Sequence, residues 1–201
     1  MSELVTFLHL GFRHITDLAA LDHMLFLLAL AAIYRGRDWR DMLWVISAFT
    51  VGHSITLALA VTDTLRLPTS LIEFLIPVTI LVTGLENILV RRRDPALLRG
   101  GYRPVFAGAF GLVHGAGFAN YLQSLFVGSI AVPLLGFNVG IELGQLVVLA
   151  LAAAVLAAVD RGIALLRAPG AQPSVYRLRV VGVSALVVLV AAEMAARRTP
   201  W

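Results

Sequence analysis

Three histidines interrupt long apolar stretches of this sequence, and a glutamate interrupts a fourth. They are His23, His53, His114 and Glu142. An ionisable side chain at membrane depth costs about 2.5 to 3.5 kcal/mol on insertion scales, so each of these residues needs a partner or a function. Imidazole binds nickel, zinc and copper ions, and a carboxylate can complete such a ligand set. The residue types predict an intramembrane site for a divalent transition metal, with nickel or zinc as first candidates and copper or cobalt as further ones.

Other polar residues of the apolar stretches are expected to support these ligands. They are Asp22, His14, Ser54, Glu73, Glu86, Asn138 and Gln145. The carboxylate of Asp22 could hold a histidine ligand in one tautomer, as carboxylates do around protein-bound metals. Glu86 lies farther from the outer end of its span and suits an exit or proton-coupling role. A single histidine in such a stretch is more often a hydrogen-bonded packing residue than a ligand, so the prediction rests on the whole group.

The basic residues and the missing residue types exclude other chemistries. All 16 residues in the Lys and Arg total are Arg, and the chain has no Cys. A chain without Lys forms no Schiff base, and a chain without Cys has no thiolate nucleophile, disulfide or cysteine-bound iron–sulfur cluster. Imidazole, carboxylate and neutral polar groups are what remains for chemistry.

The composition predicts a membrane protein. Of the 201 residues, 59% are hydrophobic and 14% are charged, against about 45 to 50% and about 25% in ordinary globular chains. Apolar runs of about 18 residues or more can cross a hydrocarbon core of about 30 Å. The expected fold is all-α, a single transmembrane domain over residues 1–201 that forms a polytopic helix bundle in the lipid bilayer. Its six predicted spans cover residues 18–34, 42–62, 70–90, 104–127, 131–159 and 177–196.

The arginines predict the orientation of this bundle. Twelve of the 16 lie in three loops, at residues 35–40, 91–103 and 161–179. Because basic loops stay on the cytoplasmic side, both termini are expected to be extracytoplasmic. Arginines in these loops also face anionic lipid headgroups, so the net charge of +4 implies no nucleic-acid partner. Residues 1–16 are expected to form an outer interfacial segment or an extension of the first span, with His14 near the outer interface.

The four candidate ligands lie at similar predicted depths along their spans. At a helical rise of about 1.5 Å per residue, they lie about 8 to 20 Å in from the outer ends of their spans. Glu73 lies above this layer and Glu86 lies below it. The candidates are therefore expected to meet between the outer surface and the midplane.

Glycines predict where helices approach closely. Gly136, Gly140 and Gly144 form a ridge of small residues that admits a neighbouring helix. Glu142 points away from this ridge, so the fifth span is expected to have protein on both sides. The sequence His-Gly-Ala-Gly at residues 114–117 has weak helix propensity. It predicts either a local break that exposes backbone carbonyls to an ion, as in transporters, or tight helix packing.

Six segments of the chain resemble one family of membrane proteins. They read GFRHI at residues 11–15, LDHMLFLL at 21–28, FTVGHSITL at 49–57, IEFLIP at 72–77, FGLVHGAGF at 110–118 and FNVGIELGQ at 137–145. In this order they resemble the HupE/UreJ family, whose members are named as hydrogenase or urease accessory proteins and are described as nickel or cobalt permeases. The resemblance implies a multi-pass protein of the bacterial cytoplasmic (inner) membrane.

The resemblance also carries the family's polar motifs onto numbered positions of this chain. The Asp-His pair falls on Asp22 and His23, the His-Ser pair on His53 and Ser54, the His-Gly pair on His114 and Gly115, and the FNxGxExGQ run on residues 137–145. The gap between His14 and Asp22 is longer here than in the family pattern, which leaves the role of His14 open.

Three functions are compatible with such a polar layer. The first is the binding and transport of a divalent metal such as nickel, which makes the chain a permease rather than an enzyme. The second is an intramembrane metal-dependent hydrolase, because a metal with an open coordination position lowers the pKa of its bound water to about 7. The third is a non-catalytic subunit of a larger membrane complex, in which the polar layer only locks helices together. The expected partners are lipid, a metal ion, and a second copy of the chain or a larger complex.

Overall fold

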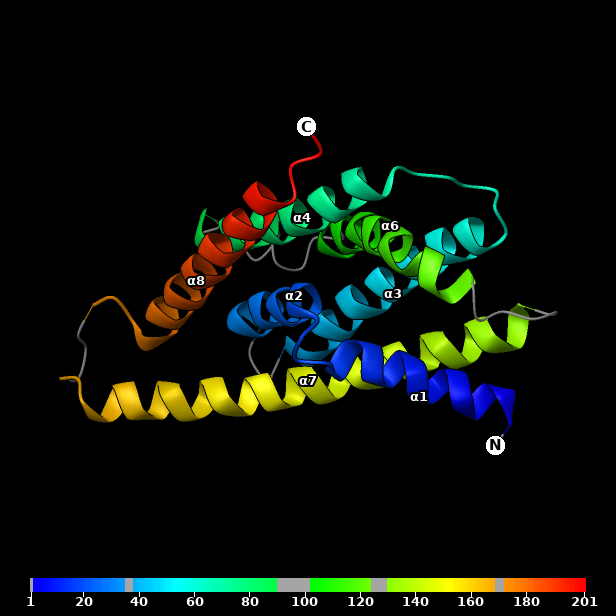
Figure 1. Ribbon diagram of the computed structural model, residues 1–201. Coiled ribbons are helices and arrows are strands. Elements are labelled where there is room, and N and C mark those ends of the chain that lie inside the picture. Colours follow the sequence, from blue (N-terminus) through cyan, green and yellow to red (C-terminus); the bar gives the residue numbers. More distant parts are fainter. Residues whose placement is uncertain (1, 35–37, 90–101, 124–129, 169–171) are drawn as a thin grey trace.

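The structure is a computed structural model that describes residues 2–34, 38–89, 102–123, 130–168 and 172–201. Every regular element within these residues is a helix, which confirms the all-α prediction for the described part of the chain. The helices are α1 (Glu3–Thr16), α2 (Leu21–Ile33), α3 (Trp39–Val61), α4 (Thr69–Leu89), α6 (Tyr102–Gln123), α7 (Ala131–Leu165) and α8 (Val175–Arg197). Figure 1 shows α7 running along one side of the bundle and crossing the direction of the other long helices.

Four helices of the described chain are long and apolar enough to cross a membrane. They are α3, α4, α7 and α8, and α1 with α2 makes a fifth span if the bent pair counts as one. The chain is therefore a membrane protein, whereas six spans and extracytoplasmic termini stay predictions. With 35 residues, α7 is longer than predicted. It extends about 52 Å, so it has to tilt or project beyond a hydrocarbon core of about 30 Å.

The first predicted span, residues 18–34, corresponds to α2, and a bend separates it from α1. α1 and α2 meet at a bend of 70°. Asp17 ends α1 with an extended backbone, and its Oδ1 accepts a hydrogen bond of 2.9 Å from the backbone N–H of Ala19. Aspartate forms such local turns in competition with helix. Residues 1–16 thus do not continue α2 as a straight helix, and the bend carries the end of α1 into the bundle beside the start of α2.

The short helix α2 lies at the centre of the bundle. Nine of its 13 residues are buried, and it contacts α4, α7 and α8 (Figure 1). Its sequence is apolar on every side, which is the pattern of a helix surrounded by protein. At about 20 Å it is too short to cross the hydrocarbon core alone. Its first turn, which carries Asp22 and His23, is thereby held inside the bundle rather than at its surface.

The predicted glycine ridge of α7 packs against α1. A Cβ atom added at Gly140 would collide with the backbone carbonyl of Leu8, and one added at Gly11 of α1 would collide with that of Phe137. Because neither position has room for a side chain, the two helices touch backbone to backbone. On its other side α7 contacts α3, where Glu142 accepts a hydrogen bond from Ser47. The fifth predicted span therefore has protein on both sides, as expected.

A second backbone-to-backbone contact joins α3 and α6. A Cβ atom at Gly111 would collide with the carbonyl of Phe49, and one at Gly115 would collide with the carbonyl of His53. α6 is a continuous helix through residues 114–117. Of the two interpretations of the His-Gly-Ala-Gly segment, tight packing is correct and the local break is wrong. Close contact with α3 compensates for the low helix propensity of these glycines.

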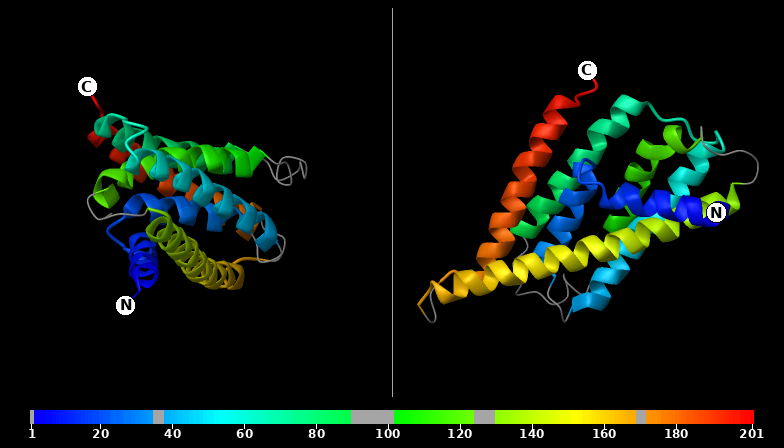
Figure 2. Two further views of the ribbon diagram at one scale, coloured as in Figure 1. Left: turned by 90° about the vertical axis from the view of Figure 1, so that its right-hand side faces the viewer. Right: turned by 60° about the horizontal axis from the view of Figure 1, so that its bottom comes forward.

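The remaining helices, α4 and α8, pack side by side and cover α2 (Figure 2). Their ends opposite the chain's C-terminus are tied to their neighbours by buried polar contacts. Asn87 Nδ2 donates to the carbonyl of Ala29 at 2.8 Å, and Tyr176 Oη donates to the carbonyl of Ile33 at 2.9 Å. Satisfying backbone carbonyls near the end of α2 in this way fixes the height of that helix within the bundle.

The glycine contacts predict opposite effects for two substitutions to alanine. Gly140→Ala should lower the free energy of unfolding by about 1 to 3 kcal/mol, because the added carbon has to push α1 away. Gly182→Ala, where an added Cβ meets nothing within 4 Å, should raise it by about 0.5 to 1 kcal/mol through the better helix propensity of alanine. Thermal unfolding in detergent, followed by circular dichroism, measures both. Equal shifts for the two variants would show that the α1–α7 contact is not close.

Candidate functional site

Four imidazole rings from four helices come together at the bend between α1 and α2. His14 ends α1, His23 begins α2, His53 lies on α3 and His114 lies on α6. The ring centres of His14 and His23 are 4.7 Å apart, those of His23 and His114 are 5.6 Å apart, and those of His14 and His53 are 6.5 Å apart. We refer to these four residues as the histidine cluster. It contains all three predicted histidine ligands, together with one supporting residue, His14.

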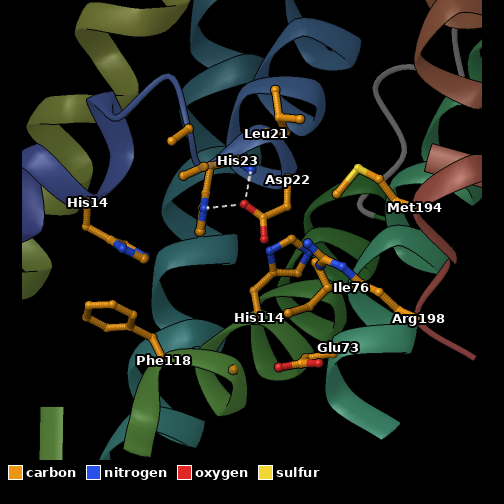
Figure 3. A pocket seen from close by; sticks show the side chains of 13 residues that line it. His14, Leu21, Asp22, His23, Glu73, Ile76, His114, Phe118, Met194 and Arg198 are labelled. Atoms are coloured by element: carbon orange, nitrogen blue, oxygen red, sulfur yellow. Dashed lines mark hydrogen bonds and ion pairs between the residues drawn. The ribbon is translucent and has the colours of Figure 1, made fainter. Parts of the chain in front are cut away.

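A cavity of about 430 Å³ leads to the histidine cluster. It lies at the end of the bundle where α4 begins and α8 ends, and Figure 3 shows His14, His23 and His114 on its wall. Its other lining residues include Asp22, Glu73, Ile76, Phe118, Met194 and Arg198. The fourth histidine, His53, is not among the lining residues and is only 1% exposed. The cluster thus has three histidines at the cavity and one behind them.

Phenylalanine rings pack around the histidine cluster, and one of them, Phe118, also lines the cavity. Phe118 and Phe137 stack with ring centres 5.3 Å apart, and Phe118 lies 4.0 Å from the ring of His14. Phe49 lies 5.1 Å from the ring of His114 and 6.2 Å from that of His53. These rings exclude water behind the cavity, so electrostatic interactions within the cluster are stronger than they would be in water.

The hydrogen bonds of Thr79 determine the tautomer of His114. The hydroxyl of Thr79 has one proton, which it donates to the carbonyl of Ile76 at 2.7 Å. Its contact of 3.1 Å with His114 Nε2 therefore has the imidazole as donor. A neutral His114 then has its lone pair on Nδ1, an atom that is buried and has no hydrogen-bond partner among the described protein groups. The ring is held with one nitrogen available to a ligand.

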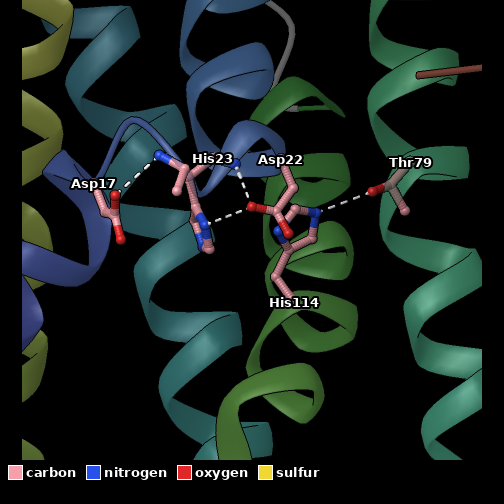
Figure 4. A network of polar contacts seen from close by, with 6 residues as sticks. Asp17, Asp22, His23, Thr79 and His114 are labelled. Atoms are coloured by element: carbon pink, nitrogen blue, oxygen red, sulfur yellow. Dashed lines mark hydrogen bonds and ion pairs between the residues drawn. The ribbon is translucent and has the colours of Figure 1, made fainter. Parts of the chain in front are cut away.

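Asp22 determines the tautomer of its neighbour His23 in a similar way. Its Oδ1 lies 3.1 Å from His23 Nδ1 and also accepts from the backbone N–H of His23 at 2.9 Å (Figure 4). A carboxylate only accepts hydrogen bonds when ionised, so Nδ1 carries the proton and the lone pair lies on Nε2. That nitrogen is also buried without a partner. The predicted contact between Asp22 and a histidine is present, and its partner is the adjacent residue.

The cluster as a whole leaves five buried ring nitrogens without partners among the described protein groups. Besides the two just described, they are His14 Nε2 and both nitrogens of His53. A buried polar group left unpaired costs about 1 to 3 kcal/mol. Packing alone does not offset this cost. The concentration of unpaired ring nitrogens at the end of one cavity therefore indicates a binding site.

The rings have the spacing of metal ligands but not yet their orientation. Two imidazoles on one tetrahedral ion have ring centres about 5 Å apart, given metal–nitrogen distances of about 2.0 to 2.1 Å. The separations of 4.7 and 5.6 Å around His23 are close to this value. Among the described residues, however, no three His, Asp or Glu side chains are arranged to hold a metal ion. Ligation would require the rings to rotate about their side-chain bonds.

The predicted residues of α7 lie outside the histidine cluster. Glu142 Oε1 accepts a hydrogen bond of 2.6 Å from Ser47 Oγ, and Gln145 Oε1 accepts one of 3.1 Å from Thr50 Oγ1. Asn138 Oδ1 is buried without a partner among the described groups. The structure therefore places Glu142 and Gln145 between α3 and α7. Depth along the helices alone does not say which faces meet.

The remaining supporting residues also have other surroundings. Ser54 donates to the carbonyl of Thr50 in its own helix at 2.6 Å, and Glu73 is an exposed residue at the cavity. Glu86 forms an ion pair of 2.9 Å with Arg103 and accepts a hydrogen bond from Tyr102. The sequence assigned Arg103 to a basic loop, whereas it is buried at the start of α6. Glu86 is thus a paired charge rather than a free carboxylate below the cluster.

Some residues of the site were missed from the sequence, and His14 was named only as a supporting residue. The prediction placed His14 near the outer interface, although Gly11 marks the face of α1 that packs on α7 and His14 lies on that side one turn later. This glycine was the available signal. No local pattern indicates that Thr79 reaches His114 or that Met194 and Arg198 of the last helix line the cavity. Those positions depend on how α4 and α8 pack around α2.

Comparison with protein families gives one result. The family described as HupE / UreJ protein matches residues 1–196, nearly the whole chain. Comparisons with curated proteins and with solved structures find no match. The match extends beyond the motif-bearing segments and includes the helices that complete the cavity.

The two tautomers can be observed directly. Nitrogen-15 spectra of histidine-labelled protein in detergent should show the proton on Nδ1 in His23 and on Nε2 in His114, because of the acceptors described above. Thr79→Val removes only the acceptor of His114 and should change the signal of that ring alone. Identical spectra of the variant and the unmodified protein would contradict the hydrogen bond from His114 to Thr79.

Proposed function

The chain belongs to the HupE/UreJ family, and from that premise we propose that it binds a divalent transition-metal ion such as Ni²⁺ in the histidine cluster and carries it across the membrane. One observation carries the proposal. His23 and His114 each bind a fixed acceptor through one ring nitrogen and keep the other nitrogen buried and unpaired. Metal-binding histidines in proteins have this arrangement, with the second nitrogen donating to a carboxylate, a carbonyl or water.

The donor set suits a borderline divalent ion. His14, His23 and His114 would supply imidazole nitrogens around the inner end of the cavity, and the carboxylate of Asp22 would offset part of the ion's charge. Imidazole favours ions such as nickel and zinc, and the absence of cysteine removes the softest ligand. The ion would exchange its water ligands for imidazoles at the point where the phenylalanine rings begin to exclude water.

The position of the cavity suggests the direction of approach. It lies at the end of the bundle where α4 begins and α8 ends, away from Arg103, Arg177 and Arg179. If the arginine-rich end faces the cytoplasm, the cavity opens to the outside. His53, behind His14 and away from the cavity, would then receive the ion as the next ligand on its way inward. The ion would pass by way of His14, which lines the cavity and has its ring centre 6.5 Å from that of His53.

Metal binding by the purified protein tests the proposal. His114→Ala and His23→Ala should reduce the binding of Ni²⁺ and Zn²⁺ to the background level, measured by equilibrium dialysis in detergent. Thr79→Val, which removes only the acceptor of His114, should lower affinity by about 10- to 100-fold. His9→Ala is the matched control, because His9 is an exposed histidine of α1 and should leave binding unchanged.

Two results would overturn parts of this proposal separately. If His114→Ala binds both metals as well as the unmodified protein, the histidine cluster is not the metal site. If binding is lost as expected but liposomes containing the unmodified protein accumulate no radiolabelled nickel, the site binds metal without transporting it.

A metal-dependent hydrolase is the second candidate, and the size of the cavity favours it. About 430 Å³ is far more than one ion needs, since a water molecule occupies about 30 Å³ of liquid. A metal at the cluster could activate a water molecule, with Asp22 or Glu73 at the cavity as base. Metal-dependent release of product from lipid or ester substrates, without metal accumulation in liposomes, would favour this function over transport.

A further inference from the structure

Glu142 differs from the other carboxylates of the helix interior in having no basic partner. Its one hydrogen bond comes from the hydroxyl of Ser47, and no Arg or His of the described chain pairs with it. The other partly buried carboxylates each have a partner: Asp22 with His23 at 3.1 Å, Glu86 with Arg103 at 2.9 Å and Asp160 with Arg179 at 2.7 Å. At membrane depth an uncompensated charge is costly, so a cation from outside the described part of the chain would stabilise an ionised Glu142.

Side-chain oxygens of α3 and α7 lie along the helix contact that holds this carboxylate. Ser47 and Thr50 of α3 lie one turn apart and bond to Glu142 and Gln145, which lie one turn apart on α7. The two hydrogen bonds are therefore neighbours across the same helix contact. We call these four residues the α3–α7 oxygen cluster. It offers a carboxylate, two hydroxyls and an amide carbonyl, and none of these donors is a nitrogen or sulfur atom.

We propose that the α3–α7 oxygen cluster binds a hard monovalent cation of the Na⁺ class. Carboxylate, hydroxyl and carbonyl oxygens favour hard cations over the borderline ions that imidazole binds. One carboxylate is neutralised by one monovalent ion, whereas a divalent ion would leave a net positive charge at membrane depth. The hydroxyl of Ser47 donates to Glu142 at 2.6 Å, which holds the carboxylate at the contact between α3 and α7.

This cation site is separate from the histidine cluster. Ser47 lies six residues before His53 on α3, which places it about 9 Å farther along that helix. The side chains of the two sites belong to different ligand classes, and no residue is shared between them. The proposal therefore stands whether or not the histidine cluster binds a metal, and the two can fail independently.

Ion-specific stabilisation of the protein in detergent tests the cation site. NaCl should raise the midpoint of thermal unfolding saturably above the value in choline chloride at equal ionic strength, because a ligand that binds only the folded state stabilises it. Glu142→Gln keeps the shape of the side chain and removes its charge, and should abolish the Na⁺-specific shift while nickel binding is retained. Glu193→Gln is the matched control, because Glu193 is exposed and paired with Arg197, and it should keep the shift.

A second variant covers the case in which Glu142→Gln does not fold. Ser47→Ala retains the carboxylate and should weaken Na⁺ affinity by about 10- to 100-fold, the usual effect of losing one contact to a charged group. The fluorescence of Trp44, one turn before Ser47 on α3, gives an independent titration of Na⁺ against choline. Absence of a Na⁺-specific change in the unmodified protein, or its persistence in Glu142→Gln, overturns the proposal. Dependence of the midpoint on pH alone would assign a proton to Glu142 instead.

Discussion

Backbone contact at glycine is the constraint on which the arrangement of this bundle depends. Gly11 of α1 lies against the carbonyl of Phe137, and Gly115 of α6 lies against the carbonyl of His53. Helices in lipid gain little from the hydrophobic effect when they associate, so close packing between small residues has to supply the attraction. Each contact also positions one histidine of the cluster, because His14 follows Gly11 by one turn and His114 directly precedes Gly115. The histidine cluster is thus built by the same contacts that hold the helices together.

The bend between α1 and α2 completes this arrangement. A straight helix through residues 3 to 33 would separate His14 from His23 by about 13 Å along its axis, whereas the bend at Asp17 brings their rings to 4.7 Å. The turn at Asp17 ends α1 inside the bundle and lets α2 start again beside it. Discontinuous helices serve as ion sites in transporters because they place helix ends at membrane depth. Here the ends carry imidazoles, so side chains rather than backbone carbonyls become the available ligands.

The features of the fold that depend on long stretches of sequence could be predicted. Long apolar helices such as α3 and α4 follow from hydropathy alone, and the ridge around Gly140 follows from the spacing of small residues. Depth along the helices correctly grouped His23 and His114. The sequence left open whether residues 1–16 form a separate segment or extend the first span, and it did not predict the burial of Arg103. Both depend on tertiary packing: a short polar break in an apolar run has the same local pattern whether the chain turns outward or inward.

The carboxylates differ in their hydrogen-bond and ion-pair partners, and this difference indicates different functions. From the depth of each residue along its predicted span, Glu86 was expected on the route inward and Glu142 among the metal ligands. The hydrogen bonds and ion pairs give both residues other partners. Glu86 is neutralised by Arg103, a cation that cannot lose its charge at any physiological pH, so it offers little attraction to a passing ion. Glu142 has only the hydroxyl of Ser47. Among the described carboxylates, Glu142 of α7 therefore offers the negative charge that can attract a cation. Its hydroxyl partner, Ser47, lies on α3, the helix that also carries His53.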